Sequence, residues 1–266
     1  MEREIFVHVP FRRLLQVRDK FLALGVGAEV YFSALDLEGH SVEEVKARLT
    51  PMVEGGVPFT LHAPFMDLNP GSVDPAVKEV TMRRWLQLLP LVEFVNARAV
   101  VVHPGFDHWR YGTLVEEWMD LAARSLLELM DKYPPHLVVA VENIFDRDPW
   151  VLKGLLERVN HPRVGHCFDV GHFLLFSGTD LETWFQALGP HLVELHLHDN
   201  RGDKDAHIAM GKGIAPWDRI FSLVEATGRD PFLVVEAHSE EDALESLKYL
   251  ERRFYRGDFG EEGYGA

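Results

Sequence analysis

The segment VELHLHDNRGDKDAH combines a strand-like alternation with a high density of side chains that bind metals or transfer protons. Two leucines alternate with Glu194, His196 and His198, so one face of the expected strand is apolar and the other carries a carboxyl group and two imidazoles. Asp205 and His207 follow in the next loop. Side chains of these types act as general acids, general bases and metal ligands. The segment therefore predicts a chemical site at the end of a strand.

Six further residues of these types lie at or just after the ends of other apolar runs. They are His62 in HAPF, His103 in HPG, Glu142 in VEN, Asp169 and His172 in VGHCFDVGH, and Glu236 in VVEAH. Each of them alone is more often a hydrogen-bonded rim residue than a ligand. Carboxylates that converge from several strands repel one another unless a positive group compensates them. The joint pattern therefore predicts a divalent metal site where the strand ends meet.

Eight short apolar runs alternate with segments of helical periodicity along the chain. The runs cover 4–9, 27–32, 58–63, 99–104, 137–143, 164–170, 193–199 and 232–238. Eight strand–helix repeats in 266 residues are typical of an α/β fold, the (β/α)8 TIM barrel, as a single domain. A doubly wound open sheet is the alternative, but PFRRLLQ follows the first run in place of the glycine-rich loop of that fold. We expect the barrel over 1–256 and a flexible tail over 257–266.

Local signals predict where several helices begin or break. Ser41 with Glu44 and Thr113 with Glu116 have the spacing of a capping box, in which the two side chains bond to each other's backbone at a helix start. Pro90 lies inside a segment of helical period, so we expect a kink or a break there.

Bulk composition narrows the classes of function. The net charge of −15 argues against broad binding to nucleic acids or anionic membranes, which requires basic surface. No apolar run approaches the roughly 18 residues that span a bilayer, and the N-terminus lacks the apolar core of a signal peptide. Cys167 is the only cysteine, which excludes an intramolecular disulfide and fits a reducing compartment. We therefore expect a cytoplasmic protein.

The chain resembles the xylose isomerase-like barrel superfamily, which includes endonuclease IV (AP endonuclease family 2) and many sugar and sugar-phosphate isomerases and epimerases. The resemblance runs from His62 to Glu236 and rests on HAPF, HPG, VEN, VGHCFDVGH, HLHDN and DAHIAMGKG in this order. It implies a cluster of up to three divalent ions, for which endonuclease IV supplies nine ligand positions. They fall on His62, His103, Glu142, Asp169, His172, His196, Asp205, His207 and Glu236.

The sugar isomerases and epimerases of the superfamily imply a smaller site with a single metal. Its ligands map to Glu142, Asp169, His196 and Glu236, with His172 near the substrate. One to three ions per chain are therefore expected, zinc or manganese first, with magnesium or iron as alternatives.

The resemblance to these enzymes implies a metal-dependent isomerase or epimerase of a small sugar or sugar phosphate. Its reaction would pass through a metal-stabilised enediolate. Glu142 and Glu236 would remove and return the proton, and His172, His198 and Arg201 would orient the substrate.

Three alternatives remain open. The first is a zinc-dependent phosphodiester hydrolase of the endonuclease IV type, which the complete ligand set favours. Against it stand the acidic charge, a short loop, and departures from the endonuclease at Phe65, His198, Asn200 and Arg201. The second is an inosose-type dehydratase, which uses the same first chemical step, and the third is a metal-binding barrel without catalysis. The substrate and the oligomeric state stay open.

Overall fold

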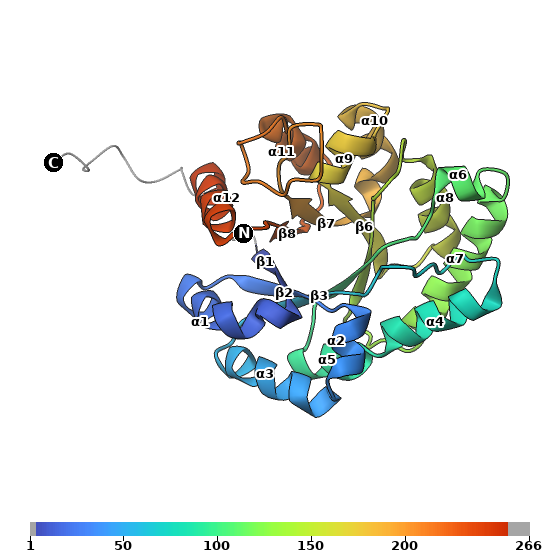
Figure 1. The fold of residues 1–266 in the computed structure, drawn as a ribbon. Coiled ribbons are helices and arrows are strands. Elements are labelled where there is room, and N and C mark those ends of the chain that lie inside the picture. Colours follow the sequence, from blue (N-terminus) through green and yellow to red (C-terminus); the bar gives the residue numbers. More distant parts are fainter. Residues whose placement is uncertain (1–3, 255–266) are drawn as a thin grey trace.

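Eight parallel strands follow one another in sequence order around a closed barrel (Figure 1). The computed structural model of the chain describes residues 4–254. The strands are β1 (Ile5–Pro10), β2 (Gly27–Tyr31), β3 (Phe59–His62), β4 (Ala99–Val102), β5 (Val138–Glu142), β6 (Val164–Asp169), β7 (Leu192–Leu197) and β8 (Phe232–Val235). Pairing of β1 with β8 closes the barrel. The predicted single-domain (β/α)8 barrel is therefore confirmed.

Each predicted apolar run overlaps one of these strands, although β1 extends one residue past its run and β7 begins one residue before its run. The seven strands other than β1 end earlier than predicted, because the residues after them already belong to the loops or helices at the C-terminal end of the barrel. The predicted bounds of the domain, 1–256, remain a prediction. The tail expected over 257–266 lies outside the described residues.

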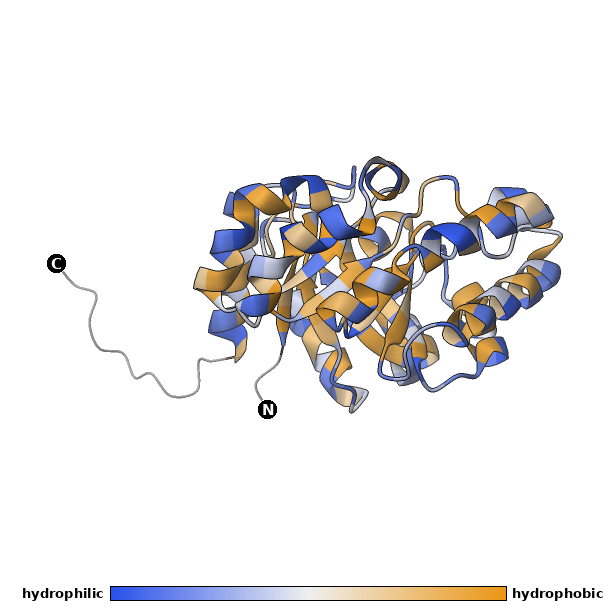
Figure 2. Ribbon diagram, turned by 90° about the horizontal axis from the view of Figure 1, so that it is seen from below, coloured by the Kyte–Doolittle hydropathy of each residue, from blue (hydrophilic) through white to orange (hydrophobic). Residues whose placement is uncertain are grey.

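Helices surround the barrel and present apolar residues to it, while hydrophilic residues face outward (Figure 2). They are α1 (Leu14–Leu24), α2 (Ala34–Gly39), α3 (Val42–Glu54), α4 (Pro75–Leu86), α5 (Leu89–Val95), α6 (His108–Tyr111), α7 (Val115–Met130), α8 (Trp150–Val159), α9 (Val170–Phe176), α10 (Leu181–Leu188), α11 (Trp217–Ala226) and α12 (Glu240–Phe254), with short 3₁₀ turns η1 (Phe11–Arg13) and η2 (Gly189–His191). Among residues 4–254, none of the helices has the length and apolarity needed to cross a membrane.

The local signals were right at two places and wrong at a third. Ser41 and Glu44 form the expected capping box at the start of α3. The helical segment around Pro90 breaks between α4 and α5, and Pro90 lies in the first turn of the latter. Thr113 does not cap α7, because the turn after α6 shifts the helix start by one residue and makes Leu114 the N-cap.

The inside of the barrel changes character from one end to the other. Val101, Ala140 and Cys167 form a small apolar layer within it. Cys167 is fully buried, as expected for a core residue one layer below Asp169. Above that layer the interior side chains are carboxylates and imidazoles, so the C-terminal ends of the strands carry the polar part of the interior.

Two asparagines connect the strand ends that carry these polar groups. Asn143, directly after β5, accepts the backbone N–H of Asp169 at 2.8 Å and donates to its carbonyl at 2.9 Å. Asn200, after β7, donates to the carbonyl of Gly171 at 2.9 Å. A Cβ at Gly171 would lie 1.9 Å from the ring of His198, so only glycine permits this close approach.

Asp199 organises the long loop between β7 and α11. Its carboxylate is fully buried and accepts four hydrogen bonds. The donors are the backbone N–H groups of Asn200, Gly211 and Ala215 and the indole of Trp217, at 3.0–3.1 Å. The same loop is tied to α12, because Asp242 accepts the N–H of Ala209 and Ser246 accepts that of Met210, both at 3.0 Å. The loop that carries Asp205 and His207 is therefore fixed from two sides.

We predict that Asp199→Asn destabilises the protein by about 2–4 kcal/mol. The amide nitrogen cannot accept, so it leaves donors such as the N–H of Gly211 and the indole of Trp217 without an acceptor, and a buried unpaired donor costs about 1–3 kcal/mol. Urea denaturation measures the change. Asp203→Asn, exposed on the same loop, is the control. Equal midpoints for both variants would contradict the role of Asp199.

Candidate metal centre

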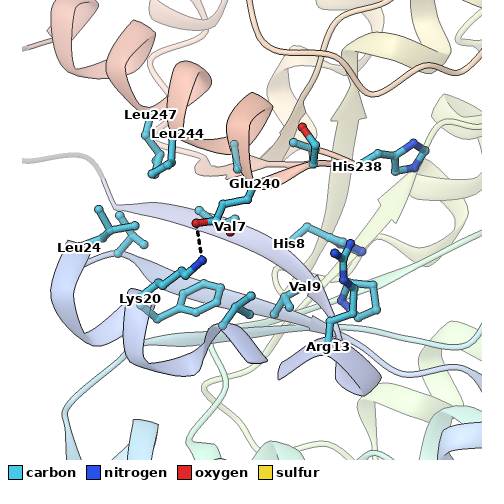
Figure 3. A pocket seen from close by; sticks show the side chains of 17 residues that line it. Val7, His8, Val9, Arg13, Lys20, Leu24, His238, Glu240, Leu244 and Leu247 are labelled. Atoms are coloured by element: carbon cyan, nitrogen blue, oxygen red, sulfur yellow. Dashed lines mark hydrogen bonds and ion pairs between the residues drawn. The ribbon is translucent and has the colours of Figure 1, made fainter. Parts of the chain in front are cut away.

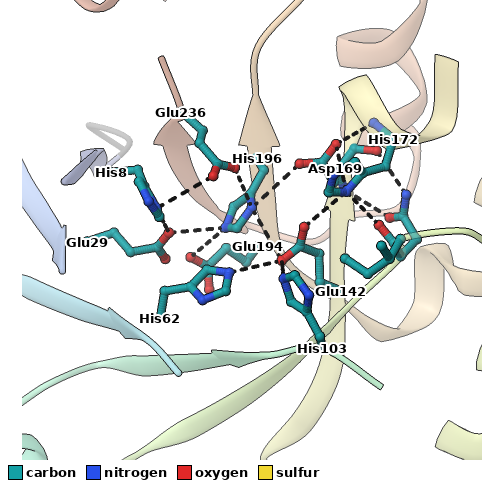
Figure 4. A network of polar contacts seen from close by, with 12 residues as sticks. His8, Glu29, His62, His103, Glu142, Asp169, His172, Glu194, His196 and Glu236 are labelled. Atoms are coloured by element: carbon teal, nitrogen blue, oxygen red, sulfur yellow. Dashed lines mark hydrogen bonds and ion pairs between the residues drawn. The ribbon is translucent and has the colours of Figure 1, made fainter. Parts of the chain in front are cut away.

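The nine residues that the sequence predicts as metal ligands all lie at the C-terminal end of the barrel and form one connected network. His62, Glu142, Asp169 and His196 belong to β3, β5, β6 and β7, His172 belongs to α9, and His103, Asp205, His207 and Glu236 lie in the loops after β4, β7 and β8. Figure 4 shows the side chains from these strands pointing toward one another. The elements therefore bring together what the sequence spacing suggested, although the ligand role of each residue remains a prediction.

Glu142 lies at the middle of the network. Its Oε2 is 3.2 Å from Nε2 of His62 and 3.1 Å from Nε2 of His103, and its Oε1 is 3.1 Å from Nδ1 of His172 (Figure 4). Burial alone raises the pKa of the Glu142 carboxyl, but His103, His196 and His172 lower it, so the net pKa lies well below its usual range. Glu142 is therefore a carboxylate, and it faces imidazoles from three directions.

A second group of donors surrounds Nδ1 of His196. This nitrogen lies 3.1 Å from Oε2 of Glu236, 3.6 Å from Oδ2 of Asp169 and 3.7 Å from Oε2 of Glu142. Side chains from β5, β6, β7 and the end of β8 thus converge on one point. These four residues are the smaller ligand set expected from the sugar isomerases and epimerases.

The outermost group contains Asp205, His207 and His198. Nε2 of His207 is 3.0 Å from Oδ2 of Asp205, and Nε2 of His172 is 3.6 Å from the same oxygen. The rings of His198 and His207 stack at 3.8 Å. Burial lowers the pKa of His207, but the carboxylates of Asp205 and Glu236 raise it by more, so the net pKa is about 9. A cation that binds here must therefore displace a proton from this imidazole.

Backbone carbonyls fix the orientation of two histidines. Nδ1 of His62 is 3.0 Å from the carbonyl of Ala63, and Nδ1 of His207 is 3.2 Å from that of Glu236. A proton assigned to Nδ1 in each ring leaves the lone pair on Nε2 directed into the centre. His207 also has a positive φ of 46°, an uncommon conformation that persists only where the surroundings enforce it.

The donor set fits divalent cations. Neither ring nitrogen of His196 has a well-aligned hydrogen bond, nor does Nδ1 of His198, although all three atoms are buried. Buried polar atoms without partners are costly, and a cation between them and the carboxylates would satisfy both. The ligand atoms of His62, His103 and Glu142 lie within 4.8 Å of one another, as do those of Glu142, Asp169 and His196 and those of His198, Asp205 and His207. Imidazole with carboxylate suits zinc, manganese and iron alike.

The three residues expected to bind substrate occupy different environments. His172 is mostly buried but reaches the opening of the centre, with 12% of its side chain exposed. His198 is fully buried and its Nε2 lies 3.0 Å from Oδ2 of Asp169, which places it among the ligand candidates. Arg201 is exposed on the loop after β7. Their roles toward a substrate remain predictions.

The sequence did not single out His8, Glu29 and Glu194 as site residues. Glu29 in β2 and Glu194 in β7 are both fully buried inside the barrel, below His196. His8 in β1 lies 3.0 Å from Oε1 of Glu29 and 3.8 Å from Oε1 of Glu236. Strand parity was the available signal, because Glu194 shares its face with His196 two residues on.

Two cavities lie outside the centre. One, of about 120 Å³, lies between α1 and α12 and is mostly apolar. His8 and His238 close its end toward the centre, and Figure 3 shows Lys20 and Glu240 paired across it. The other, of about 290 Å³, lies between the loops after β4, β5 and α9 and includes Asp146.

Asp146 generates a prediction about pH. Burial raises the pKa of its carboxyl from 3.8 to about 7, so the folded state binds this proton more tightly than the unfolded chain. The contribution of this group to the free energy of unfolding is fully present below about pH 4 and is lost as pH rises to about 7. The loss is at most about 4 kcal/mol. Asp146→Asn removes this dependence. We expect the variant to gain stability over the wild type across this range, as measured by urea denaturation at each pH.

Asp230→Asn, at an exposed position before β8, is the control for this comparison. The difference between Asp146→Asn and wild type, compared with the difference between the control and wild type, reports the effect of this carboxyl. Parallel stability profiles from pH 4 to 8 would contradict the assignment.

Comparison with known proteins places the chain among related barrels. A structure of the TTHB071 protein from Thermus thermophilus, soaked with ZnCl2, is 28% identical, with 96% of this chain and 100% of that chain covered and a TM-score of 0.76. A D-tagatose 3-epimerase-like protein is 22% identical, with 95% and 97% covered and a TM-score of 0.78. The uncharacterized protein MJ1311 from Methanocaldococcus jannaschii is 25% identical over 73% of this chain and 69% of its own length. Residues 23–253 match the model of one family, and the chain belongs to it: the xylose isomerase-like TIM barrels.

Proposed function

We propose that the protein is a metal-dependent isomerase or epimerase that acts on a small sugar or sugar phosphate. The observation that carries the proposal is the convergence of Glu142 and Glu236, from non-adjacent strands, on Nδ1 of His196 together with Asp169. This arrangement offers two carboxylates from different directions around one cation position. One carboxylate of such a pair can remove a proton from one side of a carbon, and the other can return a proton to the opposite side.

The residues around this position would have different roles in the reaction. A divalent ion bound there would polarise neighbouring oxygens of a sugar and stabilise the charge that develops when the carbon between them loses its proton. Glu236 keeps 15% of its side chain exposed, so its carboxylate can reach a substrate at the mouth of the barrel. Glu142 is almost completely buried and holds its charge among imidazoles. We assign proton transfer to these two residues.

The remaining polar groups at the mouth would bind and orient the substrate. His172 lies beside both Glu142 and Asp205 and has a partly exposed ring that can contact a hydroxyl. Arg201 is exposed and has no ion pair among residues 4–254, so its guanidinium is free to bind a phosphate group. Stacking of Phe65 on His103 at 4.1 Å closes the opposite side with an apolar surface.

Similar structures support this class of reaction. They include a D-psicose 3-epimerase with D-tagatose from Clostridium cellulolyticum H10, which is 14% identical with a TM-score of 0.74, and a 3-keto-D-glucoside 4-epimerase, YcjR, from E. coli, which is 17% identical with a TM-score of 0.71. Such identities establish the shared fold, and we extend the sugar chemistry to this chain as part of the proposal. The single cysteine supports a cytoplasmic location.

A zinc-dependent phosphodiester hydrolase is the second candidate. It is favoured by the donor groups beyond the four-residue set, namely His62 with His103 and Asp205 with His207. Together these groups could hold a cluster of ions in place of one. A dehydratase would share the first proton removal with the isomerase and differ in losing water afterwards.

Metal content separates the first two candidates. We would measure it by elemental analysis of protein purified without added metal or chelator. About one ion per chain supports the isomerase. About three zinc ions per chain would move the hydrolase to first place, and cleavage of DNA containing an abasic site would then be the decisive assay.

We predict that the metal-loaded protein exchanges hydrogen between deuterated water and the carbon next to the carbonyl of at least one ketohexose or ketose phosphate. Glu236→Gln should slow this exchange by about 10²-fold or more, because the amide cannot take up the proton. Mass spectrometry of recovered sugars measures the exchange and also detects dehydrated products. The exposed Glu241→Gln on α12 should exchange at the wild-type rate. Equal rates for Glu236→Gln and wild type would contradict the assignment.

A further inference from the structure

Two carboxyl groups lie deeper in the barrel than the metal centre. Glu29 and Glu194 are completely buried, and Figure 4 shows Glu29 beside His196 on the side toward His8 and Glu194 below the ring. A buried carboxylate loses several kcal/mol of hydration, so a fold retains one only where paired groups compensate it. Neither residue belongs to the nine-ligand set or to the proposed proton-transfer pair.

Glu29 is enclosed by donors from three strands. Its Oε1 lies 3.0 Å from Nδ1 of His8 and 3.3 Å from Nε2 of His196, and the hydroxyl of Thr60 donates to its Oε2 at 3.2 Å. The contact with His196 is the one that connects Glu29 to the metal centre. It involves the ring nitrogen opposite the one that faces Glu142, Asp169 and Glu236.

Glu194 differs from Glu29 although it is nearby. No well-aligned hydrogen bond reaches either of its carboxyl oxygens, although it lies beside Glu29. Its Oε1 is 4.0 Å from Nε2 of His196, beyond hydrogen-bond distance. Glu29 and Glu194 thus form a natural comparison: two buried glutamates below one imidazole, of which only Glu29 is within reach of it.

We propose that Glu29 is a positioning residue of the metal centre, which holds the Nε2 edge of His196 so that Nδ1 is presented to a metal ion between Glu142, Asp169 and Glu236. The proposal rests on the metal dependence of the proposed function but not on its sugar chemistry. A neutral imidazole has one N–H and one lone pair, so a carboxylate beside Nε2 selects the tautomer with its lone pair on Nδ1. The same contact makes Nδ1 a stronger ligand.

The geometry also explains why His196 lacks well-aligned hydrogen bonds. Its ring lies between carboxylates on both sides, at 3.1 Å from Glu236 and 3.3 Å from Glu29. A bond to metal on one side and a bond to Glu29 on the other would use both nitrogens. The ring then has a single orientation, which a metal site in a rigid barrel requires.

The test compares Glu29→Gln with Glu194→Gln in the full chain. Both changes keep the size of the side chain and remove one ionisable group. We expect Glu29→Gln to weaken zinc binding by about 10- to 100-fold without changing the number of ions bound, because loss of such outer carboxylates has effects of this size. Glu194→Gln should bind zinc within about threefold of wild type, as its carboxyl does not reach the imidazole. Competition with a chromophoric chelator measures both affinities.

Cobalt(II) gives a second readout that does not depend on turnover. Substitution of cobalt for zinc should show a shifted visible absorption band in Glu29→Gln and the wild-type band in Glu194→Gln. Circular dichroism of the metal-free variants establishes that both are folded. Because no substrate is present, failure of the proposed sugar reaction would leave these results unaffected.

Nitrogen-15 NMR of histidine-labelled wild type covers the case in which Glu29→Gln does not fold. In the zinc-loaded protein we expect the signal that His196→Gln removes to show a proton on Nε2 and metal on Nδ1. A proton on Nδ1 would overturn the proposal. So would equal zinc affinity of Glu29→Gln and wild type. Loss of one ion per chain in both glutamine variants would overturn it too, because the two carboxyls would then themselves hold a cation.

Discussion

The concentration of carboxyl groups inside a narrow barrel is the constraint on which the rest of the structure depends. Glu29, Glu142, Asp169 and Glu194 are almost completely removed from water. Histidines from neighbouring strands lower the pKa of Glu29, Glu142 and Asp169 against the opposing effect of burial, whereas burial and the contact with Glu29 raise that of Glu194. The imidazoles are thus the counterpart that lets an acidic interior exist, and a divalent ion would complete the same balance.

The apolar part of the fold supplies the stiffness that such a balance needs. The strands pack on a helical layer through a core of buried aliphatic and aromatic residues, and the candidate ligands lie together at one end of the barrel. Parallel strands end at one common edge, so the site residues within strands, such as Glu142, Asp169 and His196, are placed by pairing with a neighbouring strand on each side. Electrostatic repulsion among the carboxylates that the strands carry is therefore resisted by the closed sheet.

The barrel and most of the candidate site could be predicted from the sequence, because strand ends in a closed parallel sheet converge and alternation reveals which residues point inward. Glu29, which lies deeper in the barrel, was not predicted as a site residue, because a lone polar residue in a strand carries no signal of its neighbours across the barrel. The structural role of Asp199 was also not predicted from the sequence. Its donors lie up to 18 positions further along the chain, and only the folded loop brings them together.

The attachment of the β7–α11 loop to α12 has a consequence for how the protein is made. Ala209 and Met210 are held by Asp242 and Ser246 of α12, and Glu236 follows β8. A ribosome therefore releases most of the barrel before the loop that carries His207 has its final support. Because β8, Glu236 and α12 are the last elements that the structure describes, both the closed barrel and the candidate centre are complete only after all three have been synthesised.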